Sequence, residues 1–240
     1  MRIDIFLAKN KYFSSRTKAQ NAIKSGYVFV NNKLVTNSSL DIDEQSRIYI
    51  INQNNYVSRG ANKLSYAIKE LNFNFKNKIV LDVGSSTGGF TQIALINGAK
   101  YVYAVDVGCD QMDKSLANNK KIKLFENTNF RDININLFDK KIDIIIADLS
   151  FISLVKLLNK INEVFNYKLE LLLLIKPQFE LSKEIIKKNK GIIKNEKYWK
   201  IAINKIVNYA KSIGFKVINL IKSKILGKDG NTEFFIHLSK

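Results

Sequence analysis

The spacing of hydrophobic residues changes after residue 57 of this 240-residue chain. Beyond that point, short apolar runs alternate with segments in which apolar residues recur every three or four positions, as in strands alternating with amphipathic helices. The predicted strands are 79–83, 101–105, 121–125, 143–147, 170–175, 215–221 and 232–238. The predicted helices are 61–71, 89–97, 110–118, 152–165 and 195–212, and the lysine run 187–190 is expected to be exposed loop. This alternation predicts an α/β fold with a seven-stranded, mainly parallel sheet whose last strand runs antiparallel to the one before it.

Residues 1–51 follow a different pattern, which predicts a small α+β domain. Amphipathic helices at 3–10 and 16–25, strands at 27–30 and 33–35, and a further strand at 47–51 are expected. Asn31 and Asn32 separate the first two strands, and such a pair can adopt the positive φ angles of a tight hairpin. Residues 52–57 lack periodicity and are predicted to link this domain to a second domain at 58–240.

The strand at 79–83 opens into a glycine-rich turn and then into a helix that begins near Gly89. Turns at the carboxyl ends of strands are where α/β folds bind their ligands. Gly84 can adopt backbone angles forbidden to other residues, and Gly88 and Gly89 would let a ligand approach main-chain N–H groups at the helix N-terminus. The next strand ends in Asp106, an acidic residue placed to accept hydrogen bonds from ribose hydroxyls.

Several ligands can be weighed for this turn. A nucleoside triphosphate needs Lys-Ser or Lys-Thr after the last glycine, but Phe90 and Thr91 follow Gly89, so that class is excluded. A dinucleotide fingerprint needs a second glycine where Ser86 stands. The remaining pattern, D-x-G-x-x-x-G-G followed by Asp106, favours S-adenosylmethionine, and an ordinary strand-turn-helix with glycines for packing stays open. The candidate cofactor-binding residues are Asp82, Gly84, Ser85, Ser86, Thr87, Gly88, Gly89, Phe90, Asp106 and Asn129, the last placed to reach the adenine.

Composition adds a polyanionic partner to this picture. The chain has 39 basic and 21 acidic residues, a formal net charge of +18, which favours nucleic acid or an anionic membrane surface. One cysteine, Cys109, and one histidine, His237, cannot build a disulfide framework or a zinc site, so no metal is expected. The longest uncharged apolar stretch, 171–175, is too short to span a bilayer, and no signal-peptide core is present, so a soluble cytoplasmic protein is expected.

The N-terminal domain resembles the S4 RNA-binding domain. The resemblance lies in R-I-D at 2–4, S-R-T-K-A at 15–19 and I-K-S-G-Y-V-F-V-N-N at 23–32. In that family, the second helix and the hairpin present a basic surface to structured RNA. The candidate RNA-binding residues are Arg16, Lys18, Lys24 and Lys33, together with Arg59 at the start of the second domain.

The second domain resembles the class I, Rossmann-like methyltransferases, and more specifically the TlyA family. The matching stretches are S-R-G-A-N-K-L at 58–64, D-V-G-S-S-T-G-G-F-T at 82–91, A-D-L-S-F-I-S at 147–153, K-P-Q-F-E at 176–180 and G-N-T-E-F-F at 230–235. Members of that family are S-adenosylmethionine-dependent 2′-O-ribose methyltransferases of ribosomal RNA, historically labelled haemolysins. The resemblance covers nearly the whole chain.

The resemblance also implies a catalytic Lys-Asp-Lys-Glu tetrad, as in other FtsJ-type enzymes. Through the matching motifs, its members are Lys63, Asp148, Lys176 and Glu233. A ribose 2′-hydroxyl is a poor nucleophile, so a base must take its proton as the new bond forms. Lys176 is the expected base, with the two carboxylates holding the charge of Lys63 and orienting Lys176. For any one of these residues alone, an ion pair at the rim of the sheet is the simpler explanation.

Neighbouring reactions fit the sequence less well. Carbon methylation of a pyrimidine uses a thiolate, but Cys109 follows the second strand and is expected to be a partly buried small side chain. Amino methylation uses an Asn or Asp followed by prolines, whereas Asp148 precedes Leu-Ser-Phe. Phe151 and Phe179 are candidates to stack on the substrate, although aromatic residues beside a sheet are more often core.

The expected acceptor is a cytidine in large-subunit RNA. The chain begins at the S4 motif and ends soon after Phe235, and the shorter family members modify only the large subunit. The alternatives are a 2′-O-methyltransferase of another structured RNA, and a non-catalytic RNA-binding factor in ribosome assembly. A membrane-lytic role is disfavoured, because no spanning segment or strongly amphipathic cationic helix is found.

Overall fold

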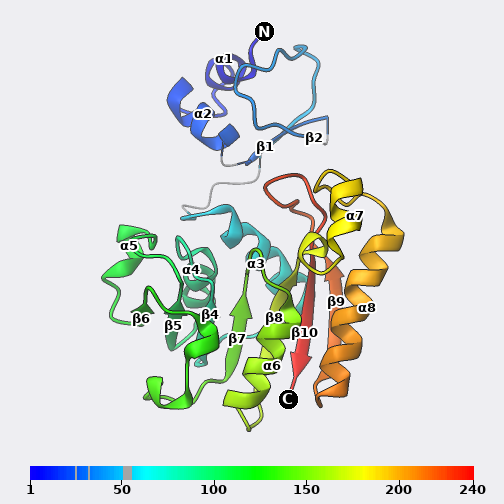
Figure 1. Cartoon of the computed structure of the whole chain (residues 1–240). Coiled ribbons are helices and arrows are strands. Elements are labelled where there is room, and N and C mark those ends of the chain that lie inside the picture. The colour runs from blue at the N-terminus through cyan, green and yellow to red at the C-terminus, as the bar shows by residue number, and fades with distance from the viewer. Residues whose placement is uncertain (25, 32, 51–55) are drawn as a thin grey trace. The chain divides into compact units, whose positions relative to one another are not determined.

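The computed structural model describes residues 1–24, 26–31, 33–50 and 56–240. It divides into two compact units, Met1–Arg59 and Gly60–Lys240 (Figure 1). Most of the predicted linker, 52–55, lies outside the described residues, as do Asn32 of the predicted hairpin and Ile51 at the end of a predicted strand. The limits of the two domains therefore stay a prediction.

The N-terminal unit contains two helices and a small antiparallel sheet. Its elements are α1 (Ile3–Lys9), α2 (Arg16–Lys24), β1 (Val28–Val30), β2 (Lys33–Leu34) and β3 (Ile48–Ile50). The strands pair in the order β2-β1-β3, with Phe29 opposite both Leu34 and Tyr49. Asn31 adopts the positive φ of 48° that the hairpin requires. Ile3, Leu7, Ile23 and Val28 are completely buried and form the centre of the core of this unit.

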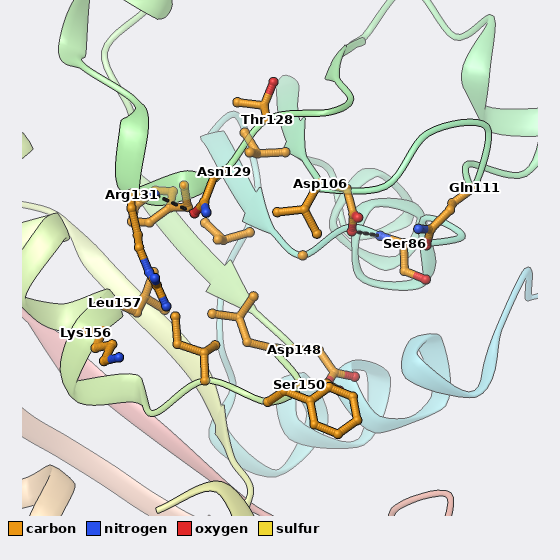
Figure 2. A pocket seen from close by; sticks show the side chains of 18 residues that line it. Ser86, Asp106, Gln111, Thr128, Asn129, Arg131, Asp148, Ser150, Lys156 and Leu157 are labelled. Atoms are coloured by element: carbon orange, nitrogen blue, oxygen red, sulfur yellow. Dashed lines mark hydrogen bonds between the residues drawn. The ribbon is translucent and has the colours of Figure 1, made fainter.

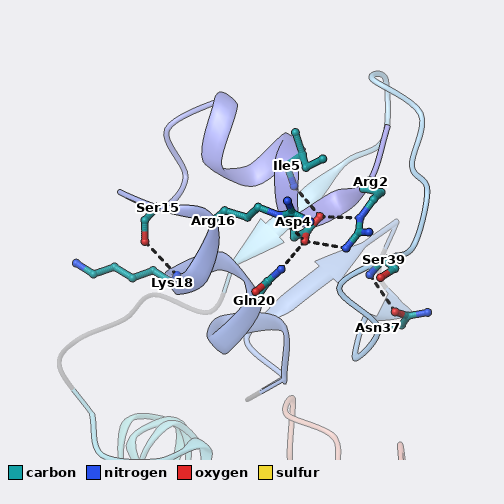
Figure 3. Close-up of polar contacts among 9 residues, drawn as sticks. All are labelled: Arg2, Asp4, Ile5, Ser15, Arg16, Lys18, Gln20, Asn37 and Ser39. Carbon is teal, nitrogen blue, oxygen red and sulfur yellow. Dashed lines mark hydrogen bonds and ion pairs between the residues drawn. The ribbon is translucent and has the colours of Figure 1, made fainter.

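A buried carboxylate joins the two helices of the N-terminal unit. Asp4 is fully buried and accepts hydrogen bonds from Arg2, Arg16 (2.9 Å) and Gln20 (2.7 Å), as Figure 3 shows. Burial alone would raise the pKa of Asp4, but the hydrogen bonds from Gln20, Arg2 and Arg16 outweigh it and hold that pKa well below its ordinary range. The guanidinium of Arg16 therefore anchors α2 to α1.

Replacing Asp4 with Asn should destabilise the N-terminal unit by roughly 2 kcal/mol at pH 7, because charge-assisted hydrogen bonds are lost. A carboxyl group with a lowered native pKa stabilises above its unfolded pKa of about 4, and this contribution is lost as the pH falls through the native value. Hydrogen exchange of the α1 and α2 amides in the full chain should show a large difference at pH 7 that persists near pH 4 and shrinks only at more acidic pH, where the native carboxyl group takes up a proton. Asp41→Asn is the matched control, because that side chain is 82 % exposed; equal exchange in both variants would contradict the expectation.

The C-terminal unit is built on a single sheet. Its strands are β4 (Ile79–Val83), β5 (Tyr101–Val105), β6 (Ile122–Phe125), β7 (Ile144–Ala147), β8 (Glu170–Ile175), β9 (Lys216–Lys222) and β10 (Phe234–Ser239). Among the described residues, seven strands pair in the order β6-β5-β4-β7-β8-β10-β9. β10 runs antiparallel to both of its neighbours, and the pairs among β4 to β8 are parallel. The predicted reversal of the last strand is confirmed, and β10 is inserted between β8 and β9.

Helices cover both faces of this sheet. They are α3 (Arg59–Leu71), α4 (Gly89–Ile96), α5 (Lys114–Ala117), α6 (Leu154–Val164), α7 (Lys183–Lys188) and α8 (Glu196–Ser212), with short 3₁₀ turns at Phe130–Asp132, Ile135–Leu137 and Pro177–Phe179. Leu81 and Val83 pack in one core with α6 and α8. Asp82 points to the opposite face because side chains alternate along a strand, and there it accepts a hydrogen bond from Thr91 of α4. Figure 1 shows α6 and α8 on one side of the sheet and α3 on the other.

Three sequence-based expectations differ from the structure. The lysine run expected as loop is helical up to Lys188, the last residue of α7, although its lysines are exposed. The helix expected near 110–118 is reduced to Lys114–Ala117, capped by Asp113. Cys109 is exposed and not partly buried. In the described part of the chain, no helix is long and apolar enough to cross a membrane.

Candidate functional site

A cavity of about 590 Å³ lies at the carboxyl ends of the parallel strands of the C-terminal unit. Four of the predicted cofactor-binding residues line it, namely Gly84, Ser86, Asp106 and Asn129. Figure 2 shows Asn129 and Thr128 on one side of the cavity and Asp148 and Ser150 on another. Strand ends place all of these residues, because each follows β4, β5, β6 or β7 in the chain.

The glycine-rich turn is attached to β5 by its own backbone. The N–H groups of Gly84 and Ser85 both donate to the carbonyl of Val105, at 2.8 and 3.2 Å. Gly84 has a φ of +80°, and a Cβ at this position would lie 2.7 Å from Cδ2 of Leu149, a lining residue of the cavity. A larger residue at position 84 would therefore be strained and would displace the side chain of Leu149.

Asp106 binds the backbone of this turn from the end of β5. Its carboxylate accepts hydrogen bonds from the N–H of Ser86 and of Gly108, both at 2.8 Å. A carboxylate has about four lone-pair positions, so capacity remains for the hydroxyl groups of a ligand. Asn129 also has an internal partner, because its Oδ1 accepts from the N–H of Arg131 at 3.0 Å.

The structure places the other predicted cofactor-binding residues away from the cavity lining. Ser85, Gly89 and Phe90 are buried, and Thr87 is exposed. A Cβ on Gly88 would lie 2.4 Å from Sδ of Met112, so this glycine permits close packing. Burial raises the pKa of Asp82 to about 7, against the opposing hydrogen bond from Thr91. Sequence reasoning missed several lining residues on the segments after β5, β6 and β7 and on α6, among them Val107, Gln111, Thr128, Arg131, Leu149 and Lys156.

The four predicted catalytic residues form one chain of ion pairs beside this cavity. Lys63 Nζ lies 2.7 Å from Glu233 Oε2 and 3.9 Å from Asp148 Oδ2, and Lys176 Nζ lies 2.6 Å from Asp148 Oδ1. Lys176 also donates to Ser150 Oγ at 3.1 Å. Asp148 lines the cavity as well, so it joins the ion-pair chain to the cavity.

Each of these four side chains comes from an element that the sequence pattern predicted. Asp148 follows β7, Lys176 follows β8, and Glu233 immediately precedes β10. β7 and β8 are adjacent and parallel, and the antiparallel β10 brings its first residues to the same edge of the sheet. Lys63 lies on α3 and is only 6 % exposed, although lysine side chains are ordinarily solvated.

The two carboxylates of the ion-pair chain, Glu233 and Asp148, differ in their surroundings. Glu233 is 2 % exposed, and burial raises its pKa, while the ammonium group of Lys63 opposes this shift and the charge of Asp148 adds to it. The side chain of Asp148 is 20 % exposed and pairs with two lysines. Lys63 thus lies between the two carboxylates, and Asp148 lies between the two lysines.

Two aromatic side chains, Phe151 and Phe179, lie near the Lys176 end of the ion-pair chain. Phe151 is 91 % exposed with a φ of +63°, and its ring centroid lies 5.1 Å from that of Phe179. A bulky residue with positive φ is uncommon, and such strain is concentrated at functional sites. Phe151 is therefore not a core residue, and it remains a candidate for stacking on a substrate.

The predicted RNA-binding residues of the N-terminal unit lie at its surface. Lys18, Lys24 and Lys33 are exposed. Arg16 is about half exposed, with its Nε hydrogen-bonded to Asp4. Arg59 begins α3 and is partly buried.

Comparisons with known proteins cover almost all of the chain. Residues 56–240 match the family model described as FtsJ-like methyltransferase, and residues 1–48 match that of the S4 domain. Hemolysin A of Brachyspira hyodysenteriae is 38 % identical over 99 % of both chains. The 23S rRNA (cytidine-2′-O)-methyltransferase TlyA of Campylobacter jejuni is 36 % identical over the full length of both. A solved structure from Streptococcus thermophilus, whose name includes the word hemolysin, has a TM-score of 0.77 and 33 % identity, covering 100 % of this chain and 88 % of that one.

Proposed function

Since the chain belongs to the TlyA family of FtsJ-like methyltransferases with an S4 domain, we propose that it methylates a ribose 2′-hydroxyl of ribosomal RNA with S-adenosylmethionine as donor. The acceptor that we favour is a cytidine of the large subunit, as in the name of the Campylobacter jejuni relative. The observation that carries the proposal is the continuous ion-pair chain Glu233–Lys63–Asp148–Lys176 beside the cavity.

The cavity fits the proposed donor in size and chemistry. Its volume of about 590 Å³ is in the range of small-molecule sites. Asp106 lies at the end of β5 with acceptor capacity for ribose hydroxyls, and Val107 and Leu149 supply apolar lining. Gly84 lines the cavity without a side chain, and a Cβ there would lie 2.7 Å from Leu149. We propose that Gly84, Ser86, Asp106 and Asn129 hold S-adenosylmethionine, which would supply an electrophilic methyl group on a sulfonium sulfur.

The proposed roles of the ion-pair chain follow from its contacts. Lys176 takes the proton that the 2′-hydroxyl loses as its oxygen gains the methyl group, and this requires Lys176 to be neutral beforehand. Asp148 and Ser150 orient the Nζ of Lys176. Lys63 is held by Glu233, which lies 2.7 Å from its Nζ in a buried position. Asp148 contacts both lysines, Lys176 at 2.6 Å and Lys63 at 3.9 Å, so it holds the two side chains close to each other.

The experiment that tests the proposal is transfer of labelled methyl from S-adenosylmethionine to purified large and small ribosomal subunits, with the product nucleoside identified. We expect 2′-O-methylcytidine in the large subunit. Donor binding without transfer to either subunit would contradict the proposed acceptor and would point to another RNA or to an assembly factor. Failure to bind the donor would contradict the proposal itself.

Gly84→Ala should weaken donor binding about tenfold or more, because the new Cβ would displace Leu149 in the cavity wall. The left-handed backbone also adds a strain of about 1–2 kcal/mol. Gly214→Ala is a matched control, since Gly214 has a φ of +92° and nothing within 4 Å of the added Cβ. Both variants should lose similar stability in chemical denaturation, while calorimetry should show a loss of donor affinity for Gly84→Ala alone. Equal affinity in the two variants would exclude Gly84 from the donor site.

Lys18→Gln and Lys33→Gln should weaken RNA binding without changing donor affinity, because we propose that both side chains contact phosphates. Each should reduce the slope of log affinity against log salt by about 1. Filter binding of large-subunit RNA fragments at several salt concentrations measures this slope. Lys9→Gln, which removes another exposed lysine of the same unit, is the control and should leave the slope unchanged. A slope unchanged in all three variants would argue against this RNA-binding surface.

A further inference from the structure

Glu180 is a buried carboxylate to which none of the proposed chemistry assigns a role. It is 5 % exposed and directly follows the 3₁₀ turn Pro177–Phe179. Its Oε2 accepts a hydrogen bond from Ser153 Oγ at 2.5 Å, and its Oε1 accepts one from the N–H of Leu154 at 2.7 Å. Ser153 is the N-cap of α6 and Leu154 is its first residue. Glu180 therefore caps a helix that begins 26 residues before it in the chain.

A third element completes this arrangement. Lys205 of α8 donates to the backbone carbonyl of Glu180 at 2.8 Å and lies 3.3 Å from its Oε2. The carboxylate is thus held between a helix N-terminus and an ammonium group, both of which favour a negative charge. A neutral amide of the same shape would keep one acceptor oxygen but would turn its NH₂ group towards one of these donors.

The two segments that Glu180 joins carry both ends of the proposed reaction centre. The segment between β7 and α6 contains Asp148 and Ser150, and the segment after β8 contains Lys176 and Phe179. The contact of Lys176 with Asp148 spans these segments at 2.6 Å, and its contact with Ser150 spans them at 3.1 Å. Glu180, four residues after Lys176, makes a second connection between the same two segments. Its two hydrogen bonds to Ser153 and Leu154 fix how the segments lie relative to each other.

We propose that Glu180 is a positioning residue, which fixes the segment after β8 against the start of α6 and so sets the position of Lys176 relative to Asp148. This inference rests on the proposed function for its catalytic consequence. The side-chain contacts of Glu180 are with Ser153, Leu154 and Lys205, so their loss leaves the glycine-rich turn and Asp106 in place. The rate of transfer is then lost far more than the affinity for the donor, because proton transfer depends on the placement of Lys176 within a fraction of an ångström.

The test compares Glu180→Gln with Glu163→Gln, which makes the same change at an exposed carboxylate of α6. For Glu180→Gln we expect single-turnover methyl transfer to fall about 100-fold, with donor affinity changed by less than about threefold, because Glu180 and the donor-binding residues share no partner. Glu163→Gln should match the wild type in both. A wild-type rate in Glu180→Gln, or equal losses of rate and donor affinity, would overturn the proposal.

Two further variants separate positioning from folding. Lys205→Met leaves the carboxylate in place and removes only its ammonium partner, so it should lose less rate than Glu180→Gln. Ser153→Ala combined with Glu180→Gln should be no slower than Glu180→Gln alone, because both changes break the same contact. Additive losses would overturn the proposal.

Hydrogen exchange of the Leu154 amide tests the contact without any activity. It should be faster in Glu180→Gln than in Glu163→Gln, and unchanged exchange would show that Glu180 does not hold the start of α6. If the wild type transfers no methyl group, the proposed function fails, while this exchange measurement still decides whether the two segments are joined by Glu180.

Discussion

Replacing Lys176 with alanine is expected to abolish methyl transfer while leaving affinity for S-adenosylmethionine within about threefold of the wild type. The proposed base is lost, and general-base catalysis contributes about 10²–10⁴-fold to the rate. Lys176 is not among the residues that line the cavity, so donor binding should be preserved. Single-turnover transfer to the large subunit and calorimetric donor binding measure the two quantities separately.

The Lys176→Arg variant tests whether position 176 needs a base or only a positive charge. Arginine keeps the positive charge and can pair with Asp148, but it does not give up its proton in proteins. It should be as inactive as alanine if Lys176 acts as a base. Substantial transfer by the arginine variant would show that position 176 needs only a cation. Lys168→Ala, an exposed lysine just before β8, is the control and should be fully active.

Replacing Lys63 with methionine should reduce both transfer and stability, with a stability loss that grows as the pH rises. The change leaves Glu233 buried without its partner at 2.7 Å. Breaking a buried ion pair costs about 3–5 kcal/mol when the remaining charge cannot be neutralised. Burial already raises the pKa of Glu233, and the loss of Lys63 removes the strongest opposing influence, so that carboxyl group can instead take up a proton.

The sign of the pH dependence follows from this pKa. A carboxyl group whose native pKa is raised costs nothing below its unfolded pKa of about 4.3, and the full penalty appears once the pH exceeds the native value. The free energy of unfolding of Lys63→Met should therefore approach that of the wild type near pH 5 and fall below it by about 3 kcal/mol at pH 8. Chemical denaturation across this range measures it. Lys69→Met, on an exposed position of the same helix, should show no such trend; a constant difference for Lys63→Met would mean that Glu233 does not titrate.

The sequence by itself determined the elements and their local chemistry. Strands 79–83, 101–105 and 170–175 were predicted with their observed limits, because continuous apolar runs are typical of strands buried on both faces. The φ of +80° at Gly84 and of 48° at Asn31 also follow from local residue preferences. These features depend on residues that are close together in the sequence, so the sequence alone is enough to predict them.

Only the tertiary structure decided which residues from distant segments contact one another. Periodicity does not show that β10 is inserted between β8 and β9, nor that Lys63 is buried against Glu233, which lies 170 positions later. The sequence suggested the four ion-pair residues only by resemblance to a family, and it gave Glu180 no role. Cys109 was expected to be partly buried and is exposed, and the lysine run near 187 was expected as loop and is partly helical. Burial and ion pairing depend on which segments the fold brings together, and that is a property of the whole core.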